Sequence, residues 1–352
     1  MDFILNGKAH GSVASALLES NMDPRVLRPY SIDGRGTYIT VTNKSTGKEQ
    51  PELISNATAT MRKDEWILLD KAIVAAAKPR LRAVTEIRKR GLTFTLDGMA
   101  KTVLQTQTQS DITPAEMAMN PVRESQNDRP EYELGSIPLP VIYKDFSIFL
   151  RELNVSRNGG SPLDTSNATL ASRRVAELCE QLLIGTYGSY KYAGGYIYGI
   201  INFPDAQSQV LTNPTDSAWT PATTVREVLA MKQKSQDAFH YGPWILFNAP
   251  AWDEHLDDDY SDAKGDNTLR ERIAKIKDIV DVVTLDYMTG YRMSLVQLTE
   301  DVIREIIGME ITTLQWESKG GLELHFKVMT IQVPQLRSDI NGNSGVINGN
   351  VA

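Results

Sequence analysis

The chain has 352 residues, of which 41% are hydrophobic and 23% are charged, and its formal net charge is −7. This length suffices for two or three domains with a sizeable core, and the composition is typical of a globular protein. The negative charge argues against a dedicated nucleic-acid-binding protein, because affinity for phosphates comes from clustered lysine and arginine.

The N-terminus, the lack of long apolar runs and the cysteine content argue against a secreted, membrane-spanning or disulfide-bonded protein. The first residues lack a basic segment and a long apolar segment, so no signal peptide is expected. No apolar run approaches the roughly 20 residues needed to cross a bilayer, so no membrane partner is expected. The single cysteine, Cys179, precludes an intrachain disulfide and is expected to be a small buried apolar residue.

Residues 1–60 are polar and rich in turn-forming residues, with a hairpin expected around 43–47. Such a segment can hardly form a core alone, so we predict an N-terminal arm that is flexible or ordered by a neighbour.

Residues 61–91 form the predicted N-terminal helix region. Trp66, Leu69 and Ile73 keep a spacing of three and four, and Pro79 bends or restarts the helix. The second half is rich in arginine. This pattern is typical of a solvated helix face, and the alternative is a basic patch for nucleic acid.

Residues 92–137 alternate only weakly between apolar and polar side chains. A stretch of about 45 residues is too long for an ordinary loop. We therefore predict two long strands that project from the body.

Residues 138–221 begin with an extended strand, followed by a turn at 154–162 and then by a long helix. Asp164 and Thr165 offer oxygens for the start of this helix, and Gly185 ends it. One narrow apolar stripe follows the helix and is the predicted core of a spine; it consists of Ala168, Ala171, Val175, Leu178 and Leu182. Glu177 and Glu180 fall outside the stripe, so replacing Glu177 with alanine is expected to be mild.

Residues 222–310 mix helix and strand signals and are predicted to form a separate α/β domain. Capping boxes start helices at Thr224 and Thr268. Residues 311–337 alternate as a half-buried strand that returns to the spine helix. Residues 338–352 are rich in Asn, Gly and Ser and are predicted to be a mobile tail.

No catalytic signature is present. The acidic run 257–262 lacks the glycine and the final glutamate of a calcium loop, and the four histidines show no metal-ligand spacing. The Gly/Tyr-rich segment 185–199 lacks the phosphate-binding glycine motifs and is typical of a turn packed against neighbours. We therefore expect no enzyme activity, cofactor or metal.

The order of several short motifs resembles the encapsulin-like major capsid proteins of tailed bacteriophages. The motifs are Arg62 to Asp70, Pro138 to Ile142, Asp145-Phe146, Arg151, Ser156-Arg157, Gly160, Leu163 to Thr165, Val175 to Glu177, Gly185 and Gly242 to Leu246. The resemblance covers roughly residues 60 to 335 and implies an α+β Hong Kong 97-type fold. Its parts are an N-terminal arm, a projecting E-loop hairpin, a peripheral P-domain with a long spine helix and strands, and an axial α/β A-domain.

The resemblance also implies a function. A major capsid protein assembles with identical subunits, as pentamers and hexamers, into an icosahedral shell around double-stranded DNA. A portal and scaffold or decoration proteins are further implied partners, and the implied location is a virion capsid assembled in the bacterial host cytoplasm. The N-terminal helix would line the inner side, with Arg82, Arg88 and Arg90 touching DNA non-specifically. The alternatives are an encapsulin-type nanocompartment shell and an α/β enzyme.

Overall fold

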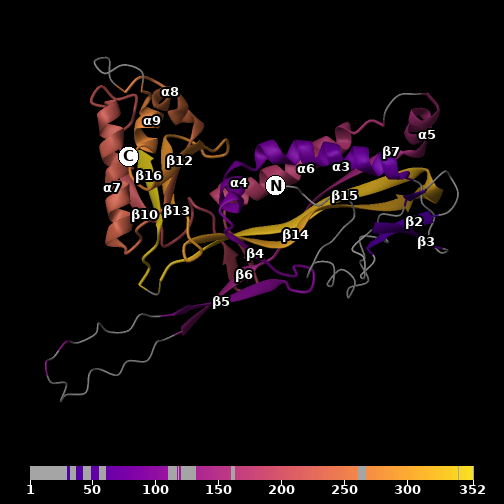
Figure 1. Ribbon diagram of the computed structural model, residues 1–352, viewed down its shortest axis with the longest axis horizontal. Coiled ribbons are helices and arrows are strands. Elements are labelled where there is room, and N and C mark those ends of the chain that lie inside the picture. The colour runs from indigo at the N-terminus through magenta and orange to yellow at the C-terminus, as the bar shows by residue number, and fades with distance from the viewer. Residues whose placement is uncertain are drawn as a thin grey trace.

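A computed structural model of the chain describes residues 30–31, 37–42, 49–54, 61–109, 117, 119, 132–159, 163–260, 267–339 and 341–351. Figure 1 shows an elongated sheet covered by helices, a compact α/β part at one end, and a two-stranded ribbon that projects from the body. We refer to the sheet with its helices as the P-domain and to the α/β part as the A-domain.

The P-domain is built on a four-stranded sheet. Its strand order is β4 (Thr93–Thr95), β14 (Ile303–Ser318), β15 (Glu323–Leu336) and β7 (Ile142–Phe149). The two long strands, β14 and β15, are antiparallel and are joined by the 3-10 turn η3 (Lys319–Gly321). Alternate residues of β15, namely Leu324, Phe326 and Val328, are fully buried toward the helices. The half-buried strand expected in 311–337 is therefore present, although its partner β14 begins eight residues earlier.

Helices cover this sheet. The spine helix α6 (Ser166–Ile184) packs on β7 and β15, and α3 (Lys63–Ala77) and α4 (Arg82–Lys89) pack against α6. Both also reach the sheet, α3 through the ring of Trp66 against Phe326 of β15 and α4 through its contact with β14. Pro79 lies in the 3-10 turn η1 (Lys78–Arg80) between α3 and α4, as the sequence predicts. Gly185 ends α6 with φ 95°, a conformation that side chains with a Cβ rarely adopt.

Because α6 is enclosed on two sides, its burial is wider than the predicted stripe. Val175 and Leu182 are buried as predicted, but Leu178 is only half-buried at the edge of the core. Glu177 and Glu180, which fall outside the predicted stripe, are also buried. The prediction of one narrow stripe was wrong because it assumed that only one face of the helix is covered.

The A-domain contains a five-stranded mixed sheet. Its order is β10 (Gln207–Leu211), β16 (Val346–Val351), β13 (Arg292–Gln297), β11 (Trp244–Asn248) and β12 (Ile279–Thr284). The helices of this domain pack against the sheet or against one another. They are α7 (Pro221–Asp237), α8 (Asp253–Leu256) and α9 (Leu269–Ala274), with the 3-10 turn η2 (Pro250–Trp252). Trp244 and Trp252 are completely buried in its core.

Three sequence expectations are wrong in this part of the chain. Residues 346–351 are not part of a mobile tail, since β16 lies inside the A-domain sheet between β10 and β13. Helix α7 starts at Pro221 with Thr220 as N-cap, one turn before the expected capping box at Thr224. The A-domain also takes in β10, which precedes the expected boundary at 222. Thr268 does cap α9 as predicted.

The remaining elements are short. Helix α5 (Leu150–Gly159) occupies most of the segment expected to be a turn at 154–162. β8 (Tyr190–Tyr192) and β9 (Gly195–Ile197) form a small hairpin after the spine. In the arm, β1 (Tyr30–Ser31), β2 (Thr37–Thr42) and β3 (Glu49–Ile54) form a sheet. Antiparallel β2 and β3 confirm the expected hairpin, whose turn at 43–48 lies outside the described residues, as does 1–29.

Candidate assembly surfaces

The projecting ribbon exposes apolar side chains on its outer half. β5 (Val103–Gln109) and β6 (Tyr132–Pro138) pair with each other as a two-stranded antiparallel sheet. Tyr132 and Leu134, on the outer half of β6, are 61% and 63% exposed. A two-stranded ribbon is marginally stable in water, and exposed apolar side chains favour contact with another molecule. The ribbon is therefore a candidate contact surface. Its strands lie in the later part of the segment predicted to project, 92–137, but the prediction was wrong for the start of that segment, since β4 pairs with β14 in the P-domain sheet.

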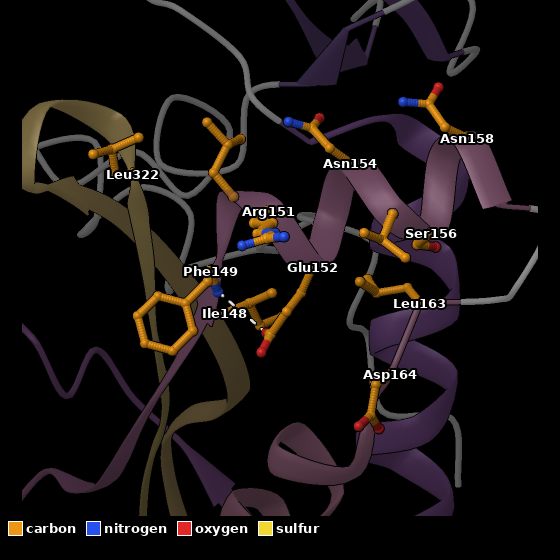
Figure 2. Close-up of a pocket in the computed structure, with 12 residues that line it drawn as sticks. Ile148, Phe149, Arg151, Glu152, Asn154, Ser156, Asn158, Leu163, Asp164 and Leu322 are labelled. Atoms are coloured by element: carbon orange, nitrogen blue, oxygen red, sulfur yellow. Dashed lines mark hydrogen bonds between the residues drawn. The ribbon is translucent and has the colours of Figure 1, made fainter.

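A second candidate is an apolar groove at the end of the P-domain distant from the A-domain. Figure 2 shows residues of α5 between Phe149 and Leu322 on one side and Leu163 and Asp164 on the other. Phe149, Leu322 and the α5 residue Val155 are each more than half exposed. Apolar side chains gathered in one groove are typical of a site that binds another surface.

The two carboxylates that line this groove serve as helix caps. Glu152 accepts a hydrogen bond from the backbone N–H of Phe149 at 3.3 Å, ahead of α5. Asp164 accepts one from the backbone N–H of Ser166 at 2.8 Å, at the start of α6. Hydrogen bonds from the side chain and from the backbone of Ser166 lower the pKa of Asp164. Both acids therefore have a structural role, and the groove offers shape and apolar contact rather than acid–base chemistry.

Arg157 on the same helix connects α5 to α3. Its guanidinium contacts both carboxylate oxygens of Glu65 at 2.7 Å. Glu65 also accepts a hydrogen bond from the backbone of Arg62, so it caps α3 as well. Bidentate arginine–carboxylate pairs fix orientation. Arg157 therefore holds the wall of the groove in place.

Glu177 joins the spine helix to the A-domain. It accepts hydrogen bonds from Arg173 at 2.7 Å and Arg174 at 2.9 Å, and Arg80 lies 4.0 Å away. Burial alone would raise the pKa of Glu177, but the hydrogen bonds from Arg173, from Tyr287 of the A-domain and from Arg174 bring it below its ordinary value. Glu177 thus accepts hydrogen bonds from side chains of both domains.

We expect Glu177→Ala to lower the free energy of unfolding by about 1–3 kcal/mol, because several partners lose one buried acceptor. This replaces the mild effect expected from sequence. Arg174→Ala is the control, since that side chain is largely exposed and Glu177 keeps its other partners. Urea unfolding of unassembled subunits measures both, and equal midpoints for the two variants would contradict this role for Glu177.

Glu180 caps a helix that is distant in sequence. Its carboxylate accepts hydrogen bonds from the backbone N–H groups of Ala83 at 2.6 Å and Val84 at 3.3 Å, in the first turn of α4. Burial raises the pKa of Glu180 to about 7, although these two N–H groups oppose the shift. The spine thus supplies the cap that α4 lacks within its own sequence.

The raised pKa of Glu180 predicts a pH dependence of stability. A carboxyl that binds its proton more tightly when folded stabilises the protein at low pH. This contribution is lost as the pH rises from the unfolded pKa of 4.5 through the folded value of about 7. The loss is on the order of 3 kcal/mol. Glu180→Gln should remove this slope, measured as the difference in unfolding free energy between variant and wild type at about pH 5 and about pH 8. A constant difference would contradict the prediction.

The three arginines predicted to contact DNA lie in different surroundings. Arg88 is 6% exposed and forms an ion pair with Glu305 of β14, so its assignment as a surface contact was wrong. Burial would lower the pKa of Arg88, but Glu305 and Glu310 raise it above its ordinary value. Arg82 is exposed and reaches Asp286 of the A-domain at 3.1 Å. Arg90 is exposed.

The acidic run at 257–262 lies beside an arginine. Arg270 contacts Asp257 at 2.6 Å and Asp253 at 2.8 Å. Within the described part of the chain, which omits 261–266, no group of three or more His, Cys, Asp or Glu is placed to hold a metal ion.

Cys179 is buried, as predicted, and burial raises the pKa of its thiol. None of the described helices combines the length and apolar character needed to span a bilayer.

Comparison with known proteins identifies the family of this chain. Residues 56–349 match the family model described as "Family of unknown function (DUF6260)". The chain belongs to the DUF6260 family.

A curated relative of this DUF6260 chain is the type 1 encapsulin shell protein EncA of Myxococcus xanthus (strain DK1622). The two are 23% identical over 201 residues, which are 57% of this chain and 65% of EncA. The match thus spans just under two thirds of that relative.

Solved structures give the fold of the DUF6260 chain. The virus-like particle from Pyrococcus furiosus matches with a TM-score of 0.57 at 14% identity, covering 80% of this chain and 98% of that one. The capsid of Myoviridae phage XM1 matches with 0.54 at 9% identity, covering 75% and 91%. The capsid of a native GTA particle matches with 0.54 at 10% identity, covering 89% and 98%. The α+β Hong Kong 97-type capsid fold expected from the sequence is confirmed.

Proposed function

We propose that the chain is a major capsid subunit that assembles with identical copies into an icosahedral shell around double-stranded DNA, as in a tailed bacteriophage. The projecting ribbon carries the proposal. Its exposed Tyr132 and Leu134 gain burial only when another molecule covers them. The fold shared with capsids makes an identical subunit the partner that best fits this need.

The partners follow from this role. Pentamers and hexamers of the chain would close the shell, and each subunit would contribute several modest interfaces through the ribbon, the arm and the apolar groove. A portal and scaffold or decoration proteins complete the proposed set of partners. The proposed location is a virion capsid assembled in the cytoplasm of a bacterial host. No catalytic role is proposed.

Contact with packaged DNA would be weak and independent of sequence. Arg82 and Arg90 are the exposed members of the basic helix, and Arg88 is no longer included because it is buried. With a net charge of −7, such contact should weaken steeply as salt concentration rises.

The second candidate is an encapsulin-type compartment, in which the shell encloses protein rather than DNA. The relative EncA, an encapsulin shell protein by name, favours it. The two candidates share subunit, fold and shell, and they differ in the content of the particle.

Electron microscopy of the full chain after expression tests the shared part. Closed particles of uniform size are the expected result, and monomers or small oligomers would contradict both candidates. Treating purified particles with nuclease and then analysing their content separates the two, since protected DNA supports the capsid and a co-purifying enclosed protein supports the compartment.

A further inference from the structure

One strand of the projecting ribbon crosses the β8–β9 hairpin at a glycine. A Cβ placed on Gly195 of β9 would lie 2.4 Å from the carbonyl oxygen of Ser136 in β6 and 2.8 Å from its carbonyl carbon. Both atoms belong to backbone, so no side-chain rotation can relieve such a contact. The two backbones can therefore approach this closely only if residue 195 has no side chain.

The segment that leads into the other strand, β5, makes a second close contact between two backbones. Gly98 precedes β5, and its N–H donates to the carbonyl oxygen of Gly308 in β14 at 3.1 Å. A Cβ on Gly98 would lie 2.7 Å from the Cα of Gly308, and a Cβ on Gly308 would lie 2.8 Å from the Cα of Gly98. Each glycine thus allows the close approach of the other. The contact lies where the chain between β4 and β5 leaves the P-domain sheet toward the ribbon.

The root of the ribbon also packs on an apolar cluster formed largely by β14 and β15. Met99, Leu104 and Ile137 from the root pack against it. The buried members are Leu96, Leu139, Ile197, Ile306, Met309, Leu314, Met329, Ile331 and Val333. The backbone N–H of Leu139 donates to the oxygen of Thr102 at 2.9 Å, which closes the ribbon at its base. The root is therefore packed and the outer half is exposed.

We propose that the subunit itself fixes the direction of the ribbon before assembly, through these two glycine crossings. Gly98, Gly195 and Gly308 are then positioning residues for the contact between subunits, an inference that rests on the proposed shell function. A strand of seven residues extends roughly 23 Å, so a tilt of about 10° at the root moves its end by roughly 4 Å. A small change at a glycine would thus carry the exposed apolar side chains away from their partner surface.

Gly195→Ala tests the crossing, and Gly135→Ala is the matched control. Gly135 also lies in the ribbon, but a Cβ there meets only the side-chain oxygen of Thr106 closely, at 3.2 Å, and that side chain can rotate. The readout is the distance between spin labels on exposed Gln107 of β5 and exposed Lys71 of α3, in unassembled subunits with Cys179→Ala. Particle yield by electron microscopy is the second readout.

We expect one narrow distance distribution in the parent and in Gly135→Ala, and a distribution displaced by several ångströms in Gly195→Ala. Particle yield should fall at least tenfold in Gly195→Ala and stay unchanged in the control. A broad distribution in the parent, an undisplaced one in Gly195→Ala, or normal particles from displaced subunits would each overturn the inference. Gly308→Ala repeats the test on the other strand if Gly195→Ala does not fold. A parent chain that forms no particles would overturn the proposed function, while the label distances still decide the direction of the ribbon.

Discussion

Arg88→Met is expected to lower the free energy of unfolding of the subunit by about 3–5 kcal/mol. The guanidinium makes a two-pronged contact with Glu305, with Nε 2.5 Å from Oε2 and Nη2 2.9 Å from Oε1, and Nη1 lies 3.3 Å from Glu310. Arg88 and Glu305 are both nearly inaccessible to solvent. Removing only the cation leaves the Glu305 carboxylate buried without its counter-charge. Urea titration of unassembled subunits measures the loss.

Two further variants separate this cause from others. Arg90→Met changes an exposed arginine two residues along the chain and should leave stability nearly unchanged. The double variant Arg88→Met/Glu305→Leu should recover much of the loss, because no charge is then left buried. If Arg88→Met were as stable as Arg90→Met, the ion pair would not support the fold. The predicted role of Arg88 as a surface contact to DNA would then have to be considered again.

The buried position of Arg88 could not be predicted from its neighbours in sequence. A run of arginines along a helix is typical of a solvated face. The partner that changes this interpretation, Glu305, lies 217 residues away on β14. Its position depends on how the sheet packs under α4, which no local pattern of charge records.

The second buried face of the spine helix did leave a signal. Ser172, Ala176, Cys179 and Leu183 also follow a spacing of four and three, and all are buried. Ser172 donates to the backbone oxygen of Ile73 in α3 at 2.8 Å. Small residues let two helices approach closely, so this stripe indicates a second packed helix. The prediction of one apolar stripe missed it because serine, alanine and cysteine give a weak apolar signal.

The C-terminal strand β16 shows why composition misled the prediction of a mobile tail. Asn348 donates to the backbone oxygen of Ile200 at 2.9 Å and accepts from Ser294 at 2.7 Å, so this asparagine is a buried connector. A Cβ on Gly349 would lie 2.8 Å from the Leu211 side chain, so the glycine lets β10 pack closely. Residues typical of a tail serve specific packing here.

Features with a local cause were predicted well. The end of α6 at Gly185, the break at Pro79 and the cap at Thr268 each depend on the chemistry of one residue and its near neighbours. The ribbon was predicted from the weakness of its core pattern. Its root at Gly98 and Gly195 was not, since close approach of two distant backbones leaves no periodic trace in sequence.

Leu182→Asp should cause the other large loss, because it places an unpaired charge in the core shared by α6 and the sheet. Leu182 is 4% exposed, and burying a carboxylate there without a partner costs several kcal/mol, a large part of the roughly 5–15 kcal/mol that stabilise a typical protein. Leu178→Asp should cost less, because Leu178 is only half-buried.

Leu170→Asp is the control for the same helix, since Leu170 is 56% exposed and its aspartate would stay in water. Soluble yield and thermal melting compare the three variants. We expect Leu182→Asp to be insoluble or to melt far below wild type, Leu178→Asp to fall between, and Leu170→Asp to match wild type. Leu182→Asp subunits that fold and melt like Leu170→Asp would mean that residue 182 does not face the sheet, and the rotation of the spine helix about its axis would have to be reassigned.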